Sequence, residues 1–297
     1  MSDNNINEQK ILTVALAGAP NAGKSTLTNY LVGEKVSIIS PKVQTTRDLI
    51  RGVFVEDNTQ IILLDTPGVF IPQKARLLER KIVKTAWSGI RDADLTCLLI
   101  DSTEKFGNKV KIIIDEFKKK EVENILVLNK VDLVKKTKLL ELTKEITNYY
   151  PDFKEIFMIS AETGEGVDKL KNYILSRAKQ GEWIFKDDEL TDVPLKFLAS
   201  EITREKLFLK LNQELPYSVD VETEKWEEFD NGDIKIQQVI YVLKENQKSI
   251  ILGKRGKLIK EIGMESRQEL QKFLNKKVHL FLFVKLKENW IEEKFRE

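Results

Sequence analysis

The sequence predicts two domains: an α/β domain with a mostly parallel sheet, followed by a smaller α+β domain. The chain has 297 residues, enough for two hydrophobic cores. From residue 11 to about 180, short apolar runs alternate with amphipathic stretches, as in parallel sheets. The polar, acidic stretch "GEWIFKDDELTD" follows at 181–192 and is typical of a linker. We therefore expect a flexible tail at 1–10 and domains at 11–180 and 193–297.

Five apolar runs are the expected strands of the first domain. Two stretches between them, 75–93 and 109–120, have the spacing of amphipathic helices. In a parallel sheet, ligands bind beyond the carboxyl ends of the strands, so the loops after the strands are the candidate site. The expected strands are 11–17, 59–65, 93–101, 123–130 and 155–160.

The first such loop is "GAPNAGKS", residues 18–25, between a strand and a helix. Its spacing of Gly18, Gly23, Lys24 and Ser25 is that of a phosphate-binding loop, in which backbone N–H groups and a helix N-terminus surround phosphates. Lys24 would hold the β- and γ-phosphates and Ser25 a Mg²⁺ ion. A glycine turn with a lysine nearby is the alternative. The expected nucleotide contacts are Gly18, Ala19, Pro20, Asn21, Ala22, Gly23, Lys24, Ser25 and Thr26.

The second loop is "DTPG", residues 65–68. The Asp65 carboxylate suits the surroundings of Mg²⁺, and the Gly68 N–H can approach the γ-phosphate. Asp65 as the cap of a turn is the alternative. Thr66 and Pro67 lie between them and complete the predicted phosphate contacts.

Two further loops predict which base is bound. "NKVD" supplies Asn129, Lys130 and Asp132 after an apolar strand. A carboxylate accepts two hydrogen bonds side by side, and guanine has two neighbouring donors where adenine has none, so Asp132 favours guanine. "ISAETGEG" adds Ser160 and Ala161, whose N–H could reach the guanine carbonyl. A polar turn is the alternative for each short motif.

The second domain contains "SIILGKRGKLIKEIG", which places two glycines between an apolar strand and a helix. The glycines allow close approach of a phosphodiester backbone, and the basic side chains neutralise its phosphates. This is the arrangement of the KH module, whose glycine loop clamps about four nucleotides of single-stranded RNA. A basic turn on a protein-binding domain is the alternative. The candidate RNA contacts are Gly253, Lys254, Arg255, Gly256, Lys257 and Lys260.

Composition limits the class of protein. The net charge of +2 restricts any nucleic-acid site to a local patch. The single cysteine, Cys97, lies in an expected buried strand and leaves no disulfide framework or cysteine metal site. No secretory signal and no run of roughly 18–20 apolar residues is present, so a soluble, cytoplasmic protein is expected.

The motifs "GAPNAGKS", "QTTRD", "DTPG", "NKVD", "ISA" and "GKRG" together resemble the translation-factor-related GTPases, and more closely the Era family, over nearly the whole chain after the tail. The resemblance implies a P-loop GTPase domain and a type II KH domain. It also implies hydrolysis of GTP to GDP and binding of 16S rRNA near its 3′ end during maturation of the small (30S) ribosomal subunit. The alternative is a regulatory, membrane-associated GTPase with a C-terminal protein-interaction module. Peripheral contact with the inner face of the cell membrane stays open.

By the same resemblance, "QTTRD" at 44–48 is the first switch, and Thr46 completes the Mg²⁺ ligands with Ser25 and Asp65; Thr45 is the adjacent alternative. The second switch begins at "DTPGV" and runs towards the helix with Leu77 and Leu78. Val69 occupies the place where many GTPases have a water-orienting glutamine, so slow hydrolysis is expected. Asn21 resembles an asparagine that helps hold K⁺, a hypothetical second cofactor. The expected catalytic groups are Lys24, Thr46 and Gly68.

Overall fold

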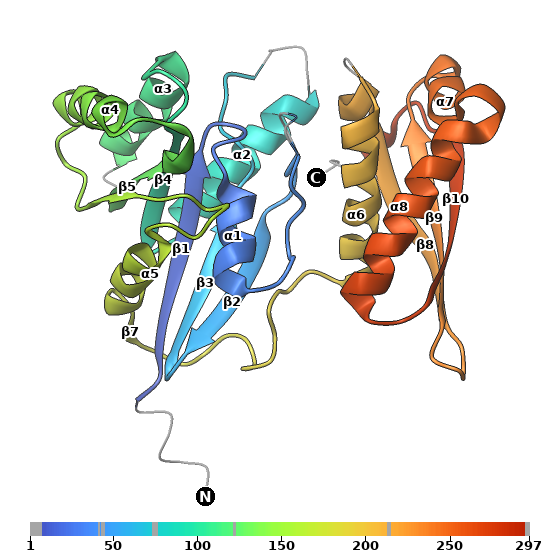
Figure 1. Ribbon diagram of the computed structural model, residues 1–297, viewed down its shortest axis with the longest axis horizontal. Coiled ribbons are helices and arrows are strands. Elements are labelled where there is room, and N and C mark those ends of the chain that lie inside the picture. The colour runs from blue at the N-terminus through green and yellow to red at the C-terminus, as the bar shows by residue number, and fades with distance from the viewer. Residues whose placement is uncertain are drawn as a thin grey trace, which may run out of the picture. The chain divides into compact units, whose positions relative to one another are not determined.

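The computed structural model describes residues 8–40, 42, 45–72, 77–120, 123–212 and 215–294. The chain divides into two compact units (Figure 1). The first unit holds the described residues of 1–37 and 46–192, and the second holds those of 38–45 and 193–297. No helix within the described residues is long and apolar enough to cross a lipid bilayer.

The first unit is built on a mostly parallel sheet, as predicted. Strand β1 pairs in parallel with β3 and β4, and the parallel pairing continues through β5 and β6, whereas β2 and the short β7 are antiparallel. Strand β2 was absent from the expected set; it turns directly into β3 through Asp57, which adopts a left-handed backbone (φ 51°). In spatial order the strands are β2 (Ile50–Glu56), β3 (Thr59–Asp65), β1 (Lys10–Gly18), β4 (Leu95–Asp101), β5 (Asn124–Asn129) and β6 (Ile156–Met158), with β7 (Lys179–Gln180) beside β1.

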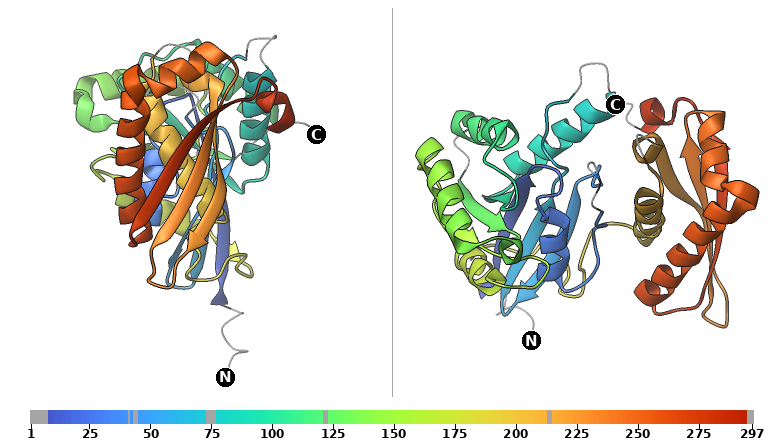
Figure 2. Two further views of the ribbon diagram at one scale, coloured as in Figure 1. Left: turned by 90° about the vertical axis from the view of Figure 1, so that its right-hand side faces the viewer. Right: turned by 45° about the horizontal axis from the view of Figure 1, so that its top comes forward.

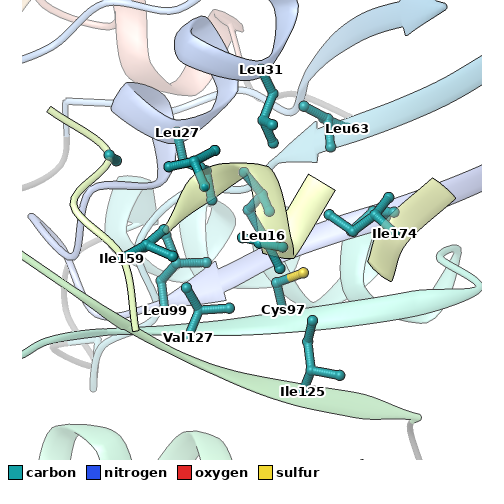
Figure 3. Packing of buried hydrophobic residues seen from close by; sticks show 14 of the residues in the cluster. Leu16, Leu27, Leu31, Leu63, Cys97, Leu99, Ile125, Val127, Ile159 and Ile174 are labelled. Carbon is teal, nitrogen blue, oxygen red and sulfur yellow. The ribbon is translucent and has the colours of Figure 1, made fainter. Parts of the chain in front are cut away.

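Strand β1 is buried on both sides, because helices cover both faces of this sheet. Leu16 points into the core on the side of α1 (Lys24–Val32) and α5 (Val167–Ser176), where Figure 3 shows it with Leu27 and Cys97. Its neighbour Ala15 faces the opposite core, which contains residues of α2 (Leu77–Arg91), α3 (Asn108–Lys120) and α4 (Lys136–Tyr149). Cys97 is fully buried as predicted, and burial raises the pKa of its thiol.

The segment 181–192, expected to be a linker, packs on the first unit. The buried amide of Gln60 donates to the Phe185 carbonyl at 2.8 Å and accepts from the N–H groups of Ile184 and Phe185 at 3.0 and 3.1 Å. The N–H of Val53 donates to the Leu190 carbonyl at 2.8 Å. A buried amide requires partners, and this segment supplies them to Gln60.

The second unit is a smaller α+β structure, as predicted. Helices α6 and α8 cover one face of its three-stranded sheet, as the right-hand view of Figure 2 shows. Strand β9 pairs in antiparallel with β8 and in parallel with β10. The elements are α6 (Leu195–Lys210), β8 (Val219–Glu228), β9 (Ile234–Val242), α7 (Glu245–Leu252), α8 (Lys257–Leu274), β10 (Val278–Leu286) and α9 (Trp290–Lys294).

The segment before the glycine loop is helical, so the predicted strand at this place was wrong. Residues 245–252 form α7, which begins where the Gln247 side chain accepts hydrogen bonds from the N–H groups of Leu243 and Lys244 at 2.9 and 3.1 Å. This capping interaction fixes the first turn of the helix. A short apolar run such as "SIIL" fits a helix or a strand equally well without such context.

Residues 38–45 group with the second unit, although the sequence places them within 11–180. The Lys42 ammonium donates to the carbonyls of Phe208 and Leu211 at the end of α6. The Arg204 guanidinium of the same helix donates to the Thr45 carbonyl at 2.6 Å. The contacts, rather than the position in sequence, decide the grouping of this segment.

Candidate GTP and RNA sites

The loop after β1 has the geometry of a phosphate-binding loop. Gly23 ends the loop with a left-handed backbone (φ 96°), and a Cβ added there would lie 2.0 Å from Nδ2 of Asn129. Only glycine is accommodated at this position without moving Asn129. Helix α1 begins at the next residue, Lys24, so its N-terminal N–H groups face the loop, a favourable place for phosphate.

The Lys24 ammonium is buried inside the loop. Nζ donates to the carbonyls of Ala19 at 3.0 Å and Gly18 at 3.3 Å. Burial lowers the pKa of Lys24 to about 8, and the charge of Asp65 opposes this shift. A cation held among carbonyls in a dry site is well placed to bind an anionic ligand that enters the loop.

Three oxygen atoms from distant parts of the first unit meet beside this loop. The Ser25 hydroxyl donates to Oδ2 of Asp65 at 2.7 Å, and it lies 3.1 Å from Oγ1 of Thr46. Asp65 is fully buried, and its Oδ1 has no hydrogen-bond partner among the described residues. Burial raises the pKa of Asp65, while the Ser25 hydrogen bond and the Lys24 charge act to lower it.

This oxygen set suits Mg²⁺. Mg²⁺ prefers oxygen ligands and is often held by one or two carboxylates together with substrate phosphates. The unpaired, buried Oδ1 of Asp65 marks a position where a cation would compensate the carboxylate charge. Elsewhere in the described part of the chain, no group of three or more His, Cys, Asp and Glu residues is arranged to hold a metal.

The structure distinguishes the two threonines of the first switch motif. Thr46 directs its hydroxyl to Ser25, whereas the Thr45 hydroxyl donates to the carbonyl of Lys42 at 2.7 Å. The geometry therefore favours Thr46 at the metal position. Gln44, the first residue of that motif, lies outside the described residues, as does part of the second switch, residues 73–76.

The "DTPG" loop packs tightly against the phosphate-binding loop. The N–H of Val69 donates to the Gly18 carbonyl at 3.0 Å, and a Cβ on Gly68 would lie 2.7 Å from the backbone nitrogen of Pro20. The Thr66 hydroxyl donates to the Leu16 carbonyl at 2.7 Å. The Val69 side chain lies in the hydrophobic core, so it is unable to contact water in the site.

Asn129 connects two of the predicted nucleotide loops. Its Nδ2 donates to the Ala22 carbonyl at 2.9 Å, and its Oδ1 accepts from the Ala161 N–H at 2.9 Å. The Ala161 N–H, expected to face the base, is thus bound to Asn129 in this structure. Ser160 is fully buried in the same loop and accepts at its hydroxyl from the Thr163 N–H at 3.2 Å.

The remaining "NKVD" residues line the end of β5. Lys130 has a left-handed backbone (φ 64°), and its ammonium lies 2.5 Å from Oδ2 of Asp101. Burial acts to raise the pKa of Asp101, but hydrogen bonds from Lys130 and Thr103 hold it below its usual value. Asp101 was absent from the predicted site residues, although its place at the end of an expected strand was a usable signal. Asp132 is exposed beyond this pair.

The glycine loop of the second unit joins α7 to α8. Gly253 (φ 69°) packs so closely that a Cβ would lie 2.8 Å from Cβ of Leu258, whereas a Cβ on Gly256 (φ 73°) would meet nothing within 4 Å. The loop is therefore closed on the Gly253 side and open at Gly256, where α8 begins. All four basic side chains predicted to bind RNA are exposed around it: Lys254, Arg255, Lys257 and Lys260.

Comparison with known families identifies both domains. Residues 13–130 match the family model described as "50S ribosome-binding GTPase", and residues 214–291 match that of the KH domain. Among curated proteins, GTPase Era of Sinorhizobium medicae is 51% identical over 96% of this chain and 91% of that protein. GTPase Era of Brucella suis is 49% identical with the same coverage.

Two solved structures resemble this fold throughout. One is Era in complex with MgGDPNP and nucleotides 1506–1542 of 16S ribosomal RNA, with a TM-score of 0.90, 40% identity and 95% coverage of each chain. The other is a variant of Aquifex aeolicus Era bound to GDP.AlF4-, with the same score, identity and coverage. Identity near one half over almost the whole chain, together with both domains in order, means that this chain belongs to the Era family of GTPases.

Proposed function

We propose that this chain is a GTP-hydrolysing switch that binds 16S rRNA near its 3′ end and acts in maturation of the small ribosomal subunit. The observation that carries the nucleotide part is the convergence of the Ser25, Thr46 and Asp65 oxygens beside the Lys24 ammonium. The RNA part rests on the basic glycine loop and on the likeness to Era bound to a 16S rRNA fragment. The GTPase domain spans 11–180 and the KH domain 193–297.

Ser25, Thr46 and Asp65 would hold Mg²⁺ when GTP is bound. The ion would neutralise charge on the β- and γ-phosphates. Thr46 lies on the first switch, so its hydroxyl would be fixed in the site only while the γ-phosphate is present. The loop N–H groups from Gly18 to Thr26 would surround the phosphates, and Lys24 would exchange its carbonyl partners for phosphate oxygens.

Hydrolysis depends on backbone groups and Thr46, since the buried Val69 provides no group to orient water. Gly68 packs against Pro20 of the phosphate loop, so its N–H would lie close to the γ-phosphate of a bound nucleotide. Asp132 would accept two hydrogen bonds from guanine, and Ala161 would contact the guanine carbonyl if its bond to Asn129 is exchanged. Asn21, exposed on the loop, would assist a K⁺ ion.

The KH domain would clamp single-stranded RNA at the open side of its glycine loop. Lys254, Arg255, Lys257 and Lys260 neutralise phosphates, and the N-terminus of α8 adds favourable potential. We place the protein in the cytoplasm, where it would meet the small ribosomal subunit. The alternative is peripheral association with the cell membrane. Fractionation of cell extracts into soluble and membrane fractions distinguishes these two locations.

The nucleotide assignment is tested with Thr46→Ala, and Thr45→Ala serves as the matched control. Affinity for GDP and for a non-hydrolysable GTP analogue is measured across Mg²⁺ concentrations. We expect Thr46→Ala to weaken only binding of the analogue and to raise its Mg²⁺ requirement, while Thr45→Ala behaves as the unmodified protein. Equal effects of the two substitutions would contradict the assignment.

The RNA assignment is tested with Gly256→Asp and the control Gly256→Asn. Gly256 has a left-handed backbone (φ 73°), which both Asp and Asn tolerate, but only Asp adds a negative charge. Binding of an oligonucleotide with the 16S rRNA 3′ sequence should fall at least about tenfold more for Gly256→Asp, because its carboxylate repels the phosphates. If Gly256→Asp bound RNA as tightly as the unmodified protein, the result would favour the alternative, in which the second domain is a protein-interaction module.

A further inference from the structure

The Asp101 carboxylate is held in a fixed orientation at the carboxyl end of β4. Its Oδ1 accepts from the Thr103 N–H at 2.8 Å and from the Thr103 hydroxyl at 2.6 Å. The Lys138 ammonium of α4 donates to the Thr103 carbonyl at 2.6 Å and connects this turn to the neighbouring helix. One carboxylate oxygen is thus bound within its own turn, and the other, Oδ2, lies 2.5 Å from the Lys130 ammonium.

Lys130 has a backbone conformation that a lysine rarely adopts. Its φ of 64° and ψ of 38° are left-handed, and in this conformation the Cβ of an L-residue is crowded by the following carbonyl oxygen. A residue other than glycine stays in such a conformation only where the surrounding contacts favour it. The ion pair with Asp101 is one such contact. The two side chains are 31% and 13% exposed, so the pair is largely shielded from water.

The turn at Lys130 decides where Asp132 lies. The preceding residue, Asn129, is buried and joins two of the nucleotide loops. Directly after Lys130 the chain forms a short 3-10 helix, η2 (Val131–Leu133), and the Leu133 N–H donates to the Lys130 carbonyl at 3.1 Å. The backbone of Lys130 therefore sets the direction in which the chain leaves the fixed Asn129 and carries Asp132 out of the strand.

We propose that Asp101 is a positioning residue for guanine recognition: by pairing with the Lys130 ammonium it holds the left-handed turn and thereby keeps the Asp132 carboxylate where it meets the base. This proposal rests on the proposed function of Asp132. It assigns part of the base specificity to the end of β4 and the turn that follows, which contain none of the predicted nucleotide contacts.

The test is made in the full chain with Asp101→Asn, which keeps the size of the side chain and removes the charge that faces the Lys130 ammonium. The matched control is Glu123→Gln, which removes the ion pair between Glu123 and Arg177. Glu123 directly precedes β5, so it lies the length of this strand away from Lys130. Asp132→Asn and the double variant of Asp101→Asn with Asp132→Asn complete the set. Thermal unfolding first establishes that each protein is folded.

Affinities for GDP and for inosine diphosphate are then measured. Hypoxanthine keeps the ring N–H of guanine but lacks the exocyclic amine, so the preference for GDP reports on the hydrogen bond between Asp132 and that amine. We expect Asp101→Asn to weaken GDP binding at least about tenfold and to lower the preference for GDP over inosine diphosphate at least about fivefold. The control should match the unmodified protein in both quantities.

Two further measurements test whether Asp101 acts through the turn at Lys130. In the Asp132→Asn background, Asp101→Asn should weaken GDP binding less than about twofold, because the carboxylate that it positions is already absent. Hydrogen exchange of a peptide spanning 129–135, measured without nucleotide, should be faster in Asp101→Asn and unchanged in Glu123→Gln.

Equal losses of affinity for GDP and inosine diphosphate, or no loss of either, would overturn the proposal, because neither result involves the amine that Asp132 binds. If Asp101→Asn fails to fold, Thr103→Val removes the hydroxyl that orients the Asp101 carboxylate. This variant should lower the preference for GDP in the same way, and an unchanged preference would overturn the proposal.

The failure of the proposed function would be recognised separately. If Asp132→Asn leaves both the GDP affinity and the preference for GDP unchanged, the guanine role of Asp132 fails. The exchange of the peptide spanning 129–135 still tests whether Asp101 holds the turn at Lys130.

Discussion

Asn129→Ala should weaken both the stability of the first unit and its affinity for guanine nucleotides. The Asn129 amide is 2% exposed and makes two hydrogen bonds, to the Ala22 carbonyl and from the Ala161 N–H. Ala22 and Ala161 are themselves 2% and 3% exposed, so truncation leaves both backbone groups buried without a partner. Each unsatisfied group costs about 1–3 kcal/mol, which predicts a loss of about 2–6 kcal/mol.

The assay combines calorimetry with nucleotide binding. The unfolding transition of the first unit is recognised by its shift on addition of GDP. A loss of 2 kcal/mol corresponds to a Tm lower by at least about 4 °C for a unit of this size. Because Asn129 joins the phosphate loop to the loop at Ala161, affinity for GDP and GTP should also fall at least about tenfold.

The matched control is Asn124→Ala, at the other end of the same strand. Asn124 is 1% exposed and donates to the Tyr150 hydroxyl at 3.2 Å, far along β5 from the nucleotide loops. This variant should lower the Tm and leave the nucleotide affinity of the folded protein unchanged. If Asn129→Ala lowered only the Tm, as the control does, the reasoning that Asn129 aligns the loops would be refuted.

Three further results are expected. Asp132→Asn should lower GTP affinity at least about tenfold by removing one guanine acceptor, and tight GTP binding by this variant would contradict the guanine assignment. If Asn21 helps to hold K⁺, hydrolysis should be faster in K⁺ than in Na⁺ buffer; equal rates would remove this hypothesis. The hydrogen bond with His279, assisted by Lys277, lowers the pKa of Asp233, so its carboxylate stabilises the fold above its unfolded pKa of about 3.9 and loses this effect as the pH falls through the lowered value. The Tm difference between the unmodified protein and Asp233→Asn, measured by calorimetry, should therefore shrink from about pH 6 towards about pH 3; a constant difference would contradict this.

Local patterns predicted much of the first unit. The expected strands at 59–65 and 93–101 appear as β3 and β4, because a strand buried on both faces favours a short run of consecutive apolar residues such as "IILL" or "CLLI" over alternation. Strand β2 was missed, since its mixed sequence "IRGVFVE" becomes a strand by pairing with β3. The helix α7 was also missed, because four apolar residues alone do not separate the two structures.

Local sequence patterns were enough to predict the residue types of the nucleotide loops. Gly23, Lys24 and Ser25 are fixed by their spacing, since the turn, the ammonium and the start of α1 are consecutive in the chain. The order of the nucleotide loops and the basic glycine loop were also recognisable from the sequence, and together they indicated the Era family.

The contacts that these groups make came from the folded structure alone. Asn129 donates to the carbonyl of a residue 107 positions away, and Arg204 donates to the Thr45 carbonyl across 159 positions. No local pattern indicated that residues 38–45 would group with the second unit. The physical reason is that a hydrogen bond depends on a few tenths of an ångström between atoms that folding brings together, whereas sequence patterns report on neighbours along one helix or strand.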